Sequence, residues 1–122
     1  MKREYRDYLE DILTAIDETT EFTNNLSFEM FAHDRKTINA VIRSLEVLGE
    51  AAKRISDDLR AKAPEVPWKY MAGMRDKLIH EYFSVDLRII WEVVKTELPP
   101  VRPHIQFLLE DLDNRQSPPS DH

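Results

Sequence analysis

The chain has 122 residues, of which 42% are hydrophobic and 33% are charged, and its formal net charge at pH 7 is −6. This length fits one domain with a real core, and the composition is that of an ordinary globular protein. The negative charge argues against indiscriminate binding to nucleic-acid phosphates, and the absence of cysteine excludes disulfides and zinc–thiolate sites.

The first residues, MKREYRDYLEDIL, carry a charge every two or three positions, unlike the apolar region of a signal peptide. No apolar run in the sequence approaches the roughly 18 residues that are needed to cross a membrane. We therefore expect a cytoplasmic protein that has no membrane partner.

Apolar residues recur at helical spacing through the first half of the chain. They predict one helix over 3–24 and a longer helix over 35–63, with Asp34 as the N-cap of the second. Residues 27–31 are interpreted as a short connector that packs onto the core. Gly49 lies at the edge of the apolar face of the second helix, where a glycine costs about 1 kcal/mol relative to alanine. We expect another helix to approach closely there.

The second half of the chain is punctuated by prolines and polar capping residues. A third helix is predicted over 68–82, a fourth from a cap at Ser84 or Asp86 to residue 97, and a fifth from Pro100 onward.

These patterns predict an all-α fold, an antiparallel helical bundle of four long helices plus one shorter helix. The bundle is expected to form a single domain over residues 1–113. The polar, proline-rich residues 114–122 are expected to form a disordered tail.

An arginine interrupts the apolar stripe of the third helix. That stripe consists of Met71, Met74 and Leu78, and Arg75 and Tyr82 fall on the same side of a helical wheel. Burying an unpaired guanidinium costs several kcal/mol. This face is therefore expected to meet a cavity, a counter-charge or a second subunit, and dimerisation is expected to depend on the three apolar residues.

His80 falls about 140° from Arg75 around the same helix, so the two side chains cannot converge if the helix is straight. Either the helix unwinds before Ser84, or two copies of the helix face each other across a dimer. Asp76 precedes His80 by four residues, the spacing at which a carboxylate can accept a hydrogen bond from the imidazole and orient it.

Arginine and histidine together suffice for metal-free cleavage of RNA. An imidazole transfers protons near neutral pH, a guanidinium binds a phosphate and stabilises developing charge, and the substrate's own 2′-hydroxyl is the nucleophile. A purely structural interpretation also fits the residues. In that interpretation Arg75 pairs with an acidic residue such as Glu50, and His80 caps the end of the helix.

Other polar residues give weaker signals. Lys36, Arg43 and Arg54 lie opposite the apolar face of the second helix, where a solvated surface is the simplest interpretation. Together with Lys77 they are weak candidates for an RNA path. No pair of histidines has ligand spacing such as HExxH, so neither a metal nor another cofactor is expected.

The segment RDKLIHEY, residues 75–82, resembles the Arg-x4-His-x-Tyr motif of the HepT-like toxins, within the wider HEPN ribonuclease superfamily. The similarity extends in order through four longer segments and covers roughly residues 5–110. These segments are YLEDILTAID, AVIRSLEVLGEAAKRIS, PEVPWKYMAGMRDKLIHEYFSVDLRIIWEVV and ELPPV. One departure is Ser84, where relatives often carry glycine.

The resemblance implies a HEPN-like homodimer in which the motifs of two subunits line one cleft. It implies a metal-independent endoribonuclease toxin that acts on RNA and not on DNA, with Arg75 and His80 as the catalytic pair. Glu50, Asp76 and Lys77 are possible supporting residues.

The resemblance also implies an antitoxin, a nucleotidyltransferase of the MNT type, which transfers AMP to Tyr82. The alternative is a non-catalytic helical subunit that serves a nucleotidyltransferase complex. Substitution of His80 separates the two hypotheses, because only the first requires that residue for activity.

Overall fold

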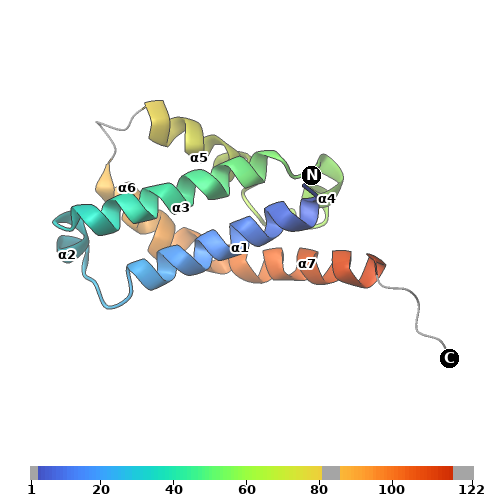
Figure 1. The fold of residues 1–122 in the computed structure, drawn as a ribbon, viewed down its shortest axis with the longest axis horizontal. Coiled ribbons are helices and arrows are strands. Elements are labelled where there is room, and N and C mark those ends of the chain that lie inside the picture. The colour runs from blue at the N-terminus through green and yellow to red at the C-terminus, as the bar shows by residue number, and fades with distance from the viewer. Residues whose placement is uncertain (1–2, 81–85, 117–122) are drawn as a thin grey trace.

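The described residues of this computed structural model are 3–80 and 86–116, and they form helices joined by short turns, with no strand among them (Figure 1). The side chains at positions 79, 80 and 116 are outside the description. The elements in chain order are α1 (Tyr5–Phe22), α2 (Phe28–Ala32), α3 (Arg35–Lys53), α4 (Asp57–Ala61), α5 (Trp68–His80), α6 (Leu87–Glu92), the π-helix η2 (Val93–Glu97), the 3₁₀ turn η3 (Pro99–Val101) and α7 (Arg102–Gln116).

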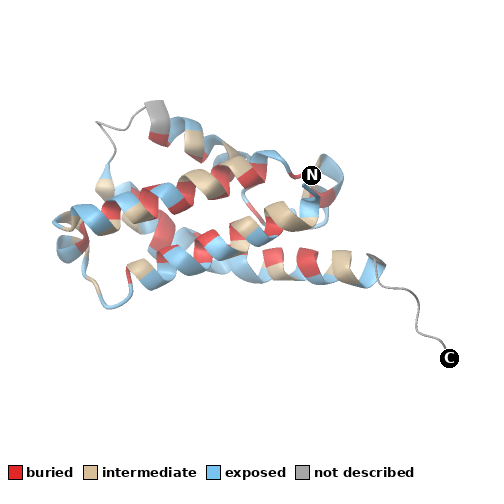
Figure 2. Cartoon of the chain, viewed as in Figure 1, coloured by how far each residue is buried: buried red, intermediate tan, exposed pale blue. Residues whose placement is uncertain are grey.

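Four long helices make up the body of the molecule. In Figure 1, α1 and α3 run antiparallel side by side, α5 packs along α3, and α7 runs antiparallel to α1. Their inward faces supply the buried residues that Figure 2 shows as red patches along each helix. The predicted all-α antiparallel bundle is confirmed. None of the described helices is long and apolar enough to cross a membrane.

Side-chain caps begin several of the helices. The carboxylate of Asp34 accepts a hydrogen bond from the amide of Thr37 at 3.1 Å, which confirms the predicted cap of α3. Asp86 caps α6 by accepting from the amide of Arg88 at 2.8 Å. Of the two predicted caps for that helix, Asp86 is therefore the one that the described residues show.

The prediction of one continuous helix over 35–63 is wrong. The chain leaves helical geometry after Lys53, and Ser56 starts α4 by accepting from the amide of Leu59 at 3.3 Å. The guanidinium of Arg60 donates to the carbonyl oxygen of Ala52 at 2.8 Å, which satisfies an acceptor at the end of α3. This break folds the chain back, so that the side chains of α4 reach the same core.

The prediction for residues 86–97 is wrong in its detail, because α6 gives way to the π-helix η2 within that range. The amide of Leu98 donates to the carbonyl oxygen of Val93 at 2.8 Å, and Lys95 Nζ donates to the carbonyl oxygen of Thr23 at 2.9 Å. The second bond ties this region to the end of α1. Helix α7 continues to Gln116, three residues beyond the predicted domain end at 113, and the rest of the predicted tail lies outside the described residues.

Candidate active site

The backbones of α3 and α5 touch at Gly49. A Cβ atom added there would lie 2.9 Å from the amide nitrogen of Arg75 and 3.0 Å from the carbonyl oxygen of Met71. These two groups are one helical turn apart, the separation of a donor and acceptor that share an α-helical hydrogen bond. The predicted close approach at Gly49 is confirmed, and it places the backbone of Arg75 directly against α3.

Arg75 occupies the edge of the buried stripe of α5. Its side chain is 41% exposed, and its Nη1 atom lies 3.6 Å from Oε2 of Glu50. Arg75 therefore lies at the margin of the apolar stripe and not at its buried centre, a difference that a helical wheel does not show. The expected counter-charge is present. It is Glu50, the acidic residue that the structural interpretation of the sequence paired with Arg75.

The apolar residues of this stripe face the chain's own core. Met71, Met74 and Leu78 are only 0%, 6% and 5% exposed. The expectation that these three side chains form a dimer face is wrong, because they are already covered by the packing of α5 against the bundle. A second copy of the chain would have to use other residues.

Glu50 holds two arginines at once. Its Oε1 atom accepts a hydrogen bond from Arg54 at 2.9 Å, while Oε2 faces Arg75 at the longer distance. Both side chains of the Arg75–Glu50 pair are substantially exposed, and such pairs contribute little to stability. An incoming phosphate can therefore replace Glu50 at the guanidinium at a small cost.

An open hollow lies beside Arg75, between α3 and the start of α1. Residues from three parts of the chain line it: Arg3, Tyr8, Asp11, Arg43, Glu46, Val47, Glu50, Ala51 and Arg75. Its three guanidinium groups are each within 4 Å of a carboxylate. The hollow therefore holds as many carboxylates as arginines, and a phosphate that reaches one of these guanidinium groups has to displace the carboxylate beside it.

Two residues that line this hollow, Arg3 and Tyr8, were not predicted as site residues from the sequence. The guanidinium of Arg3 lies 4.8 Å from the ring centroid of Tyr8, so an exposed cation and an aromatic ring lie together at the rim. Both are more than 60 positions from Arg75 along the chain, and no local spacing connects them to it. Arg43, which the sequence named only as a weak candidate, does line the hollow.

The other proposed supporting residues do not join Arg75. Lys53 Nζ donates to the two carboxylate oxygens of Asp76 at 3.2 and 3.3 Å, so Asp76 is engaged with α3. Lys77 lies on the opposite flank of α5, where it lines a different pocket with Tyr70. Whether Asp76 also orients the imidazole of His80 stays a prediction.

The other two residues of the motif, His80 and Tyr82, lie at or beyond the end of the described part of α5. His80 is the last residue of α5, and its side chain is outside the description. Tyr82 lies outside the described residues altogether. The convergence of Arg75 with His80 and the accessibility of Tyr82 therefore stay predictions. Within residues 3–80 and 86–116, no three histidine or acidic side chains are grouped so that they could hold a metal ion.

Comparison with known proteins points to one family. The model of the HepT-like ribonuclease family matches residues 12–108. A protein named "Probable ribonuclease HepT" from Thermococcus cleftensis is 53% identical over 84% of this chain and 93% of its own length.

Two further relatives extend the comparison. A "Putative RNase" of Methanocaldococcus jannaschii is 43% identical over 93% of this chain and 98% of its own length. Another protein of that description, from Caldanaerobacter subterraneus, is 46% identical over 86% of this chain and 94% of its own length. The comparison with solved structures found no match. With its all-helical fold and a match over most of its length, the chain belongs to the HepT-like ribonuclease family.

Proposed function

We propose that this protein is an endoribonuclease that cuts RNA without a metal ion, with Arg75 and His80 as its catalytic pair. The family supports cleavage of RNA. The observation that carries the assignment to Arg75 is its position: its backbone is held against α3, and its guanidinium is half-exposed beside an open hollow. A sealed structural arginine would not be presented in this way.

The chemistry follows from these groups. The 2′-hydroxyl of the substrate attacks the adjacent 3′-phosphate, the P–O5′ bond breaks, and a 2′,3′-cyclic phosphate and a 5′-hydroxyl result. His80 accepts the proton that the 2′-hydroxyl loses, and the departing 5′-oxygen takes up one proton in turn, so that the transfer balances. Arg75 exchanges Glu50 for the phosphate and stabilises the charge that develops on the phosphorane. Every atom of the nucleophile comes from the RNA.

The proposal includes a homodimer whose two motifs face one cleft. On one straight helix Arg75 and His80 point about 140° apart, so a single α5 does not supply both groups to one phosphate. A second copy provides the missing partner for each. The hollow beside Arg75 opens to the outside, which leaves room for such an arrangement.

Regulation by a nucleotidyltransferase of the MNT type completes the proposal. The hydroxyl group of Tyr82 loses its proton to solvent as its oxygen attacks the α-phosphate of ATP, so that AMP is attached through a new P–O bond and pyrophosphate leaves. The added phosphate carries negative charge and bulk close in sequence to Arg75. It would compete with RNA for the guanidinium and so neutralise the toxin.

The decisive experiment compares RNA cleavage by the wild type, His80→Ala and His33→Ala in the presence of EDTA. Intact mass must first show that Tyr82 is unmodified. His33 is an exposed histidine whose ring bonds to the carbonyl oxygen of Glu29, so His33→Ala is a matched control for the same substitution. Cleavage by the wild type and the control alone supports the proposal.

Two other results would reject it. Equal cleavage by His80→Ala removes the histidine from the mechanism. No cleavage by any of the three proteins, when all are folded and dimeric, favours the non-catalytic subunit of a nucleotidyltransferase complex. In that case each variant should still bind the nucleotidyltransferase, which sedimentation of the mixture would show.

A further inference from the structure

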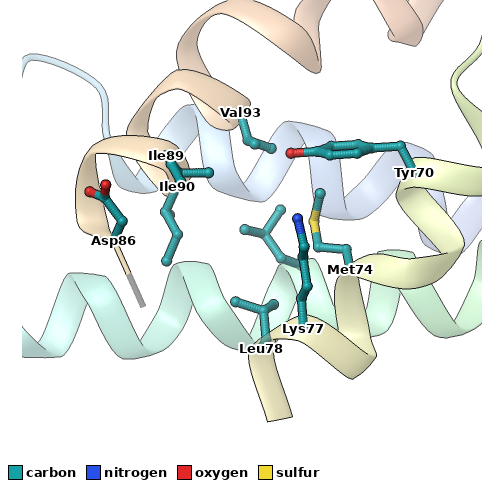
Figure 3. A pocket seen from close by; sticks show the side chains of 9 residues that line it. Tyr70, Met74, Lys77, Leu78, Asp86, Ile89, Ile90 and Val93 are labelled. Atoms are coloured by element: carbon teal, nitrogen blue, oxygen red, sulfur yellow. The ribbon is translucent and has the colours of Figure 1, made fainter. Parts of the chain in front are cut away.

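A second pocket lies on the flank of α5 that faces away from Arg75. It is formed where α3, α5, α6 and η2 meet, and its mouth is open to solvent. Figure 3 shows Tyr70, Met74, Lys77 and Leu78 approaching it from α5, opposite Ile89, Ile90 and Val93. None of these residues belongs to the hollow beside Arg75.

The walls of this pocket are mostly apolar. Its inner surface includes Leu45, Met74, Leu78 and Ile90, all of which are buried in the core. At its rim, Ile89 is 56% exposed. Its lining comes from short stretches of four elements, so the hollow is local and suits a compact ring better than an extended helix.

One positive charge lies at this pocket without a counter-ion among the described residues. The ammonium of Lys77 lies 5.8 Å from the ring centroid of Tyr70, and no carboxylate of residues 3–80 or 86–116 is within ion-pair distance of it. Asp86 lines the pocket, but its carboxylate caps α6, and Figure 3 shows it turned away from Lys77. The ammonium is therefore available to an anion.

A hydroxyl group supplies the second polar contact. Figure 3 shows the phenol oxygen of Tyr70 directed across the pocket toward Val93. Burial, and secondarily the negative charge of Glu97, raise the pKa of Tyr70 above its ordinary value of 10.0. The hydroxyl stays protonated at neutral pH and can donate to or accept from a heteroatom.

We propose that this pocket binds one nucleotide, with the base in the apolar hollow, its edge at the Tyr70 hydroxyl and a phosphate at Lys77. The inference rests on the proposed function, which makes RNA the chemistry that the protein meets. A flat heterocycle with a tethered anion satisfies all three features of the site together. An apolar peptide would leave the ammonium unused, and inorganic phosphate would leave the hollow empty.

The test is a titration of the full-length protein followed by methyl NMR. AMP and UMP are the probes, and ribose 5-phosphate is the control that carries the phosphate without a base. We expect the nucleotides to shift the methyl signals of Leu78, Ile89, Ile90 and Val93. We also expect ribose 5-phosphate to bind about tenfold more weakly, since it lacks the apolar ring.

Matched variants isolate the contact with the charge. Lys77→Met keeps the length of an exposed side chain and removes its ammonium, and we expect affinity to fall about tenfold, the scale of one charge-assisted contact. Lys69→Met makes the same change at an exposed lysine of α5 that does not line the pocket, and it should leave the affinity unchanged.

Two results would overturn the proposal. One is the absence of shifts at the pocket methyl groups with either nucleotide, and the other is equal affinity for ribose 5-phosphate, which would indicate a simple phosphate contact. An uncleavable 2′-O-methyl oligonucleotide tests whether the bound nucleotide belongs to an RNA strand or is a free nucleotide. Tighter binding than AMP at the same methyl groups indicates a strand, whereas binding of AMP alone indicates a free nucleotide.

RNA cleavage by the wild type, measured in parallel, keeps the two proposals apart. Cleavage without nucleotide binding at this pocket refutes only the further inference. Nucleotide binding without cleavage refutes only the proposed nuclease.

Discussion

Gly49→Ala is predicted to destabilise the protein, because a side chain at position 49 would clash with the backbone of α5. The new methyl group would lie 2.9 Å from a backbone nitrogen and 3.0 Å from a backbone oxygen of α5, whereas ordinary contacts begin at 3.4 Å. The two helices must therefore separate by roughly 0.5 Å, and overpacking of this kind costs about 1–3 kcal/mol. Replacing glycine by alanine within a helix returns about 1 kcal/mol. We expect a net loss of about 1 kcal/mol.

Gly73→Ala is the matched control. Gly73 also lies within a helix, its φ is negative, and a Cβ atom there would meet nothing within 4 Å. The same substitution should therefore stabilise the protein by about 0.5–1 kcal/mol. Urea unfolding monitored by circular dichroism measures both changes, and the two variants should move the free energy of unfolding in opposite directions.

The same contact links stability to activity. Moving the backbone of Arg75 by a few tenths of an ångström misplaces the guanidinium, and we expect cleavage to fall about tenfold in Gly49→Ala. Gly73→Ala should cut RNA as the wild type does. A Gly49→Ala protein that is as stable as the Gly73→Ala protein would refute the close approach, whatever its activity.

Three further outcomes follow from the structure. Arg75→Lys keeps the charge but loses the planar fork that grips a phosphate, so cleavage should fall about a hundredfold in a single-turnover assay while unfolding in urea changes little; unchanged cleavage would remove Arg75 from the mechanism. Ile105→Ala empties a fully buried site on α7 and should lower the free energy of unfolding by about 2–5 kcal/mol, with cleavage per folded molecule unchanged. The hydroxyl of Thr37, and to a lesser extent its amide, donate hydrogen bonds that lower the pKa of Asp34 below 3.8. The cap therefore stabilises the fold above that pH, and this stabilisation is lost as the pH falls through the pKa of the folded state. The urea midpoints of the wild type and Asp34→Ala should therefore differ at neutral pH and converge in acid, and a constant difference would contradict the assignment.

Local patterns in the sequence were sufficient for most of the helices. Periodic apolar residues identified the cores of α1, α3, α5 and α7, because each helix buries one face. The break after Lys53 was missed because Ile55 and Leu59 continue the apolar pattern across it, and both are buried. Ser56, followed by two aspartates, is the capping signal that could have revealed the start of α4.

The site was predicted in part. A wheel identified Arg75 as an arginine on an apolar stripe, and Glu50 was named as its possible counter-charge. The wheel did not show that Arg75 lies at the margin of that stripe, or that Met71, Met74 and Leu78 are consumed by the core of the same chain. The burial of a side chain depends on the helices packed around it, and a helical wheel represents a single helix.

The amino-acid sequence by itself determined the helical class, the position of most helices and the motif of an RNA-cleaving family, since these depend on residues close together in the chain. Tertiary packing alone decided that Arg3 and Tyr8 meet Arg75 around one hollow, and that Lys77 faces away from it into a second pocket. The physical reason is that helix crossing is governed by how ridges and small residues such as Gly49 fit together. That fit brings distant residues to one place and sends near neighbours to opposite sides of a helix.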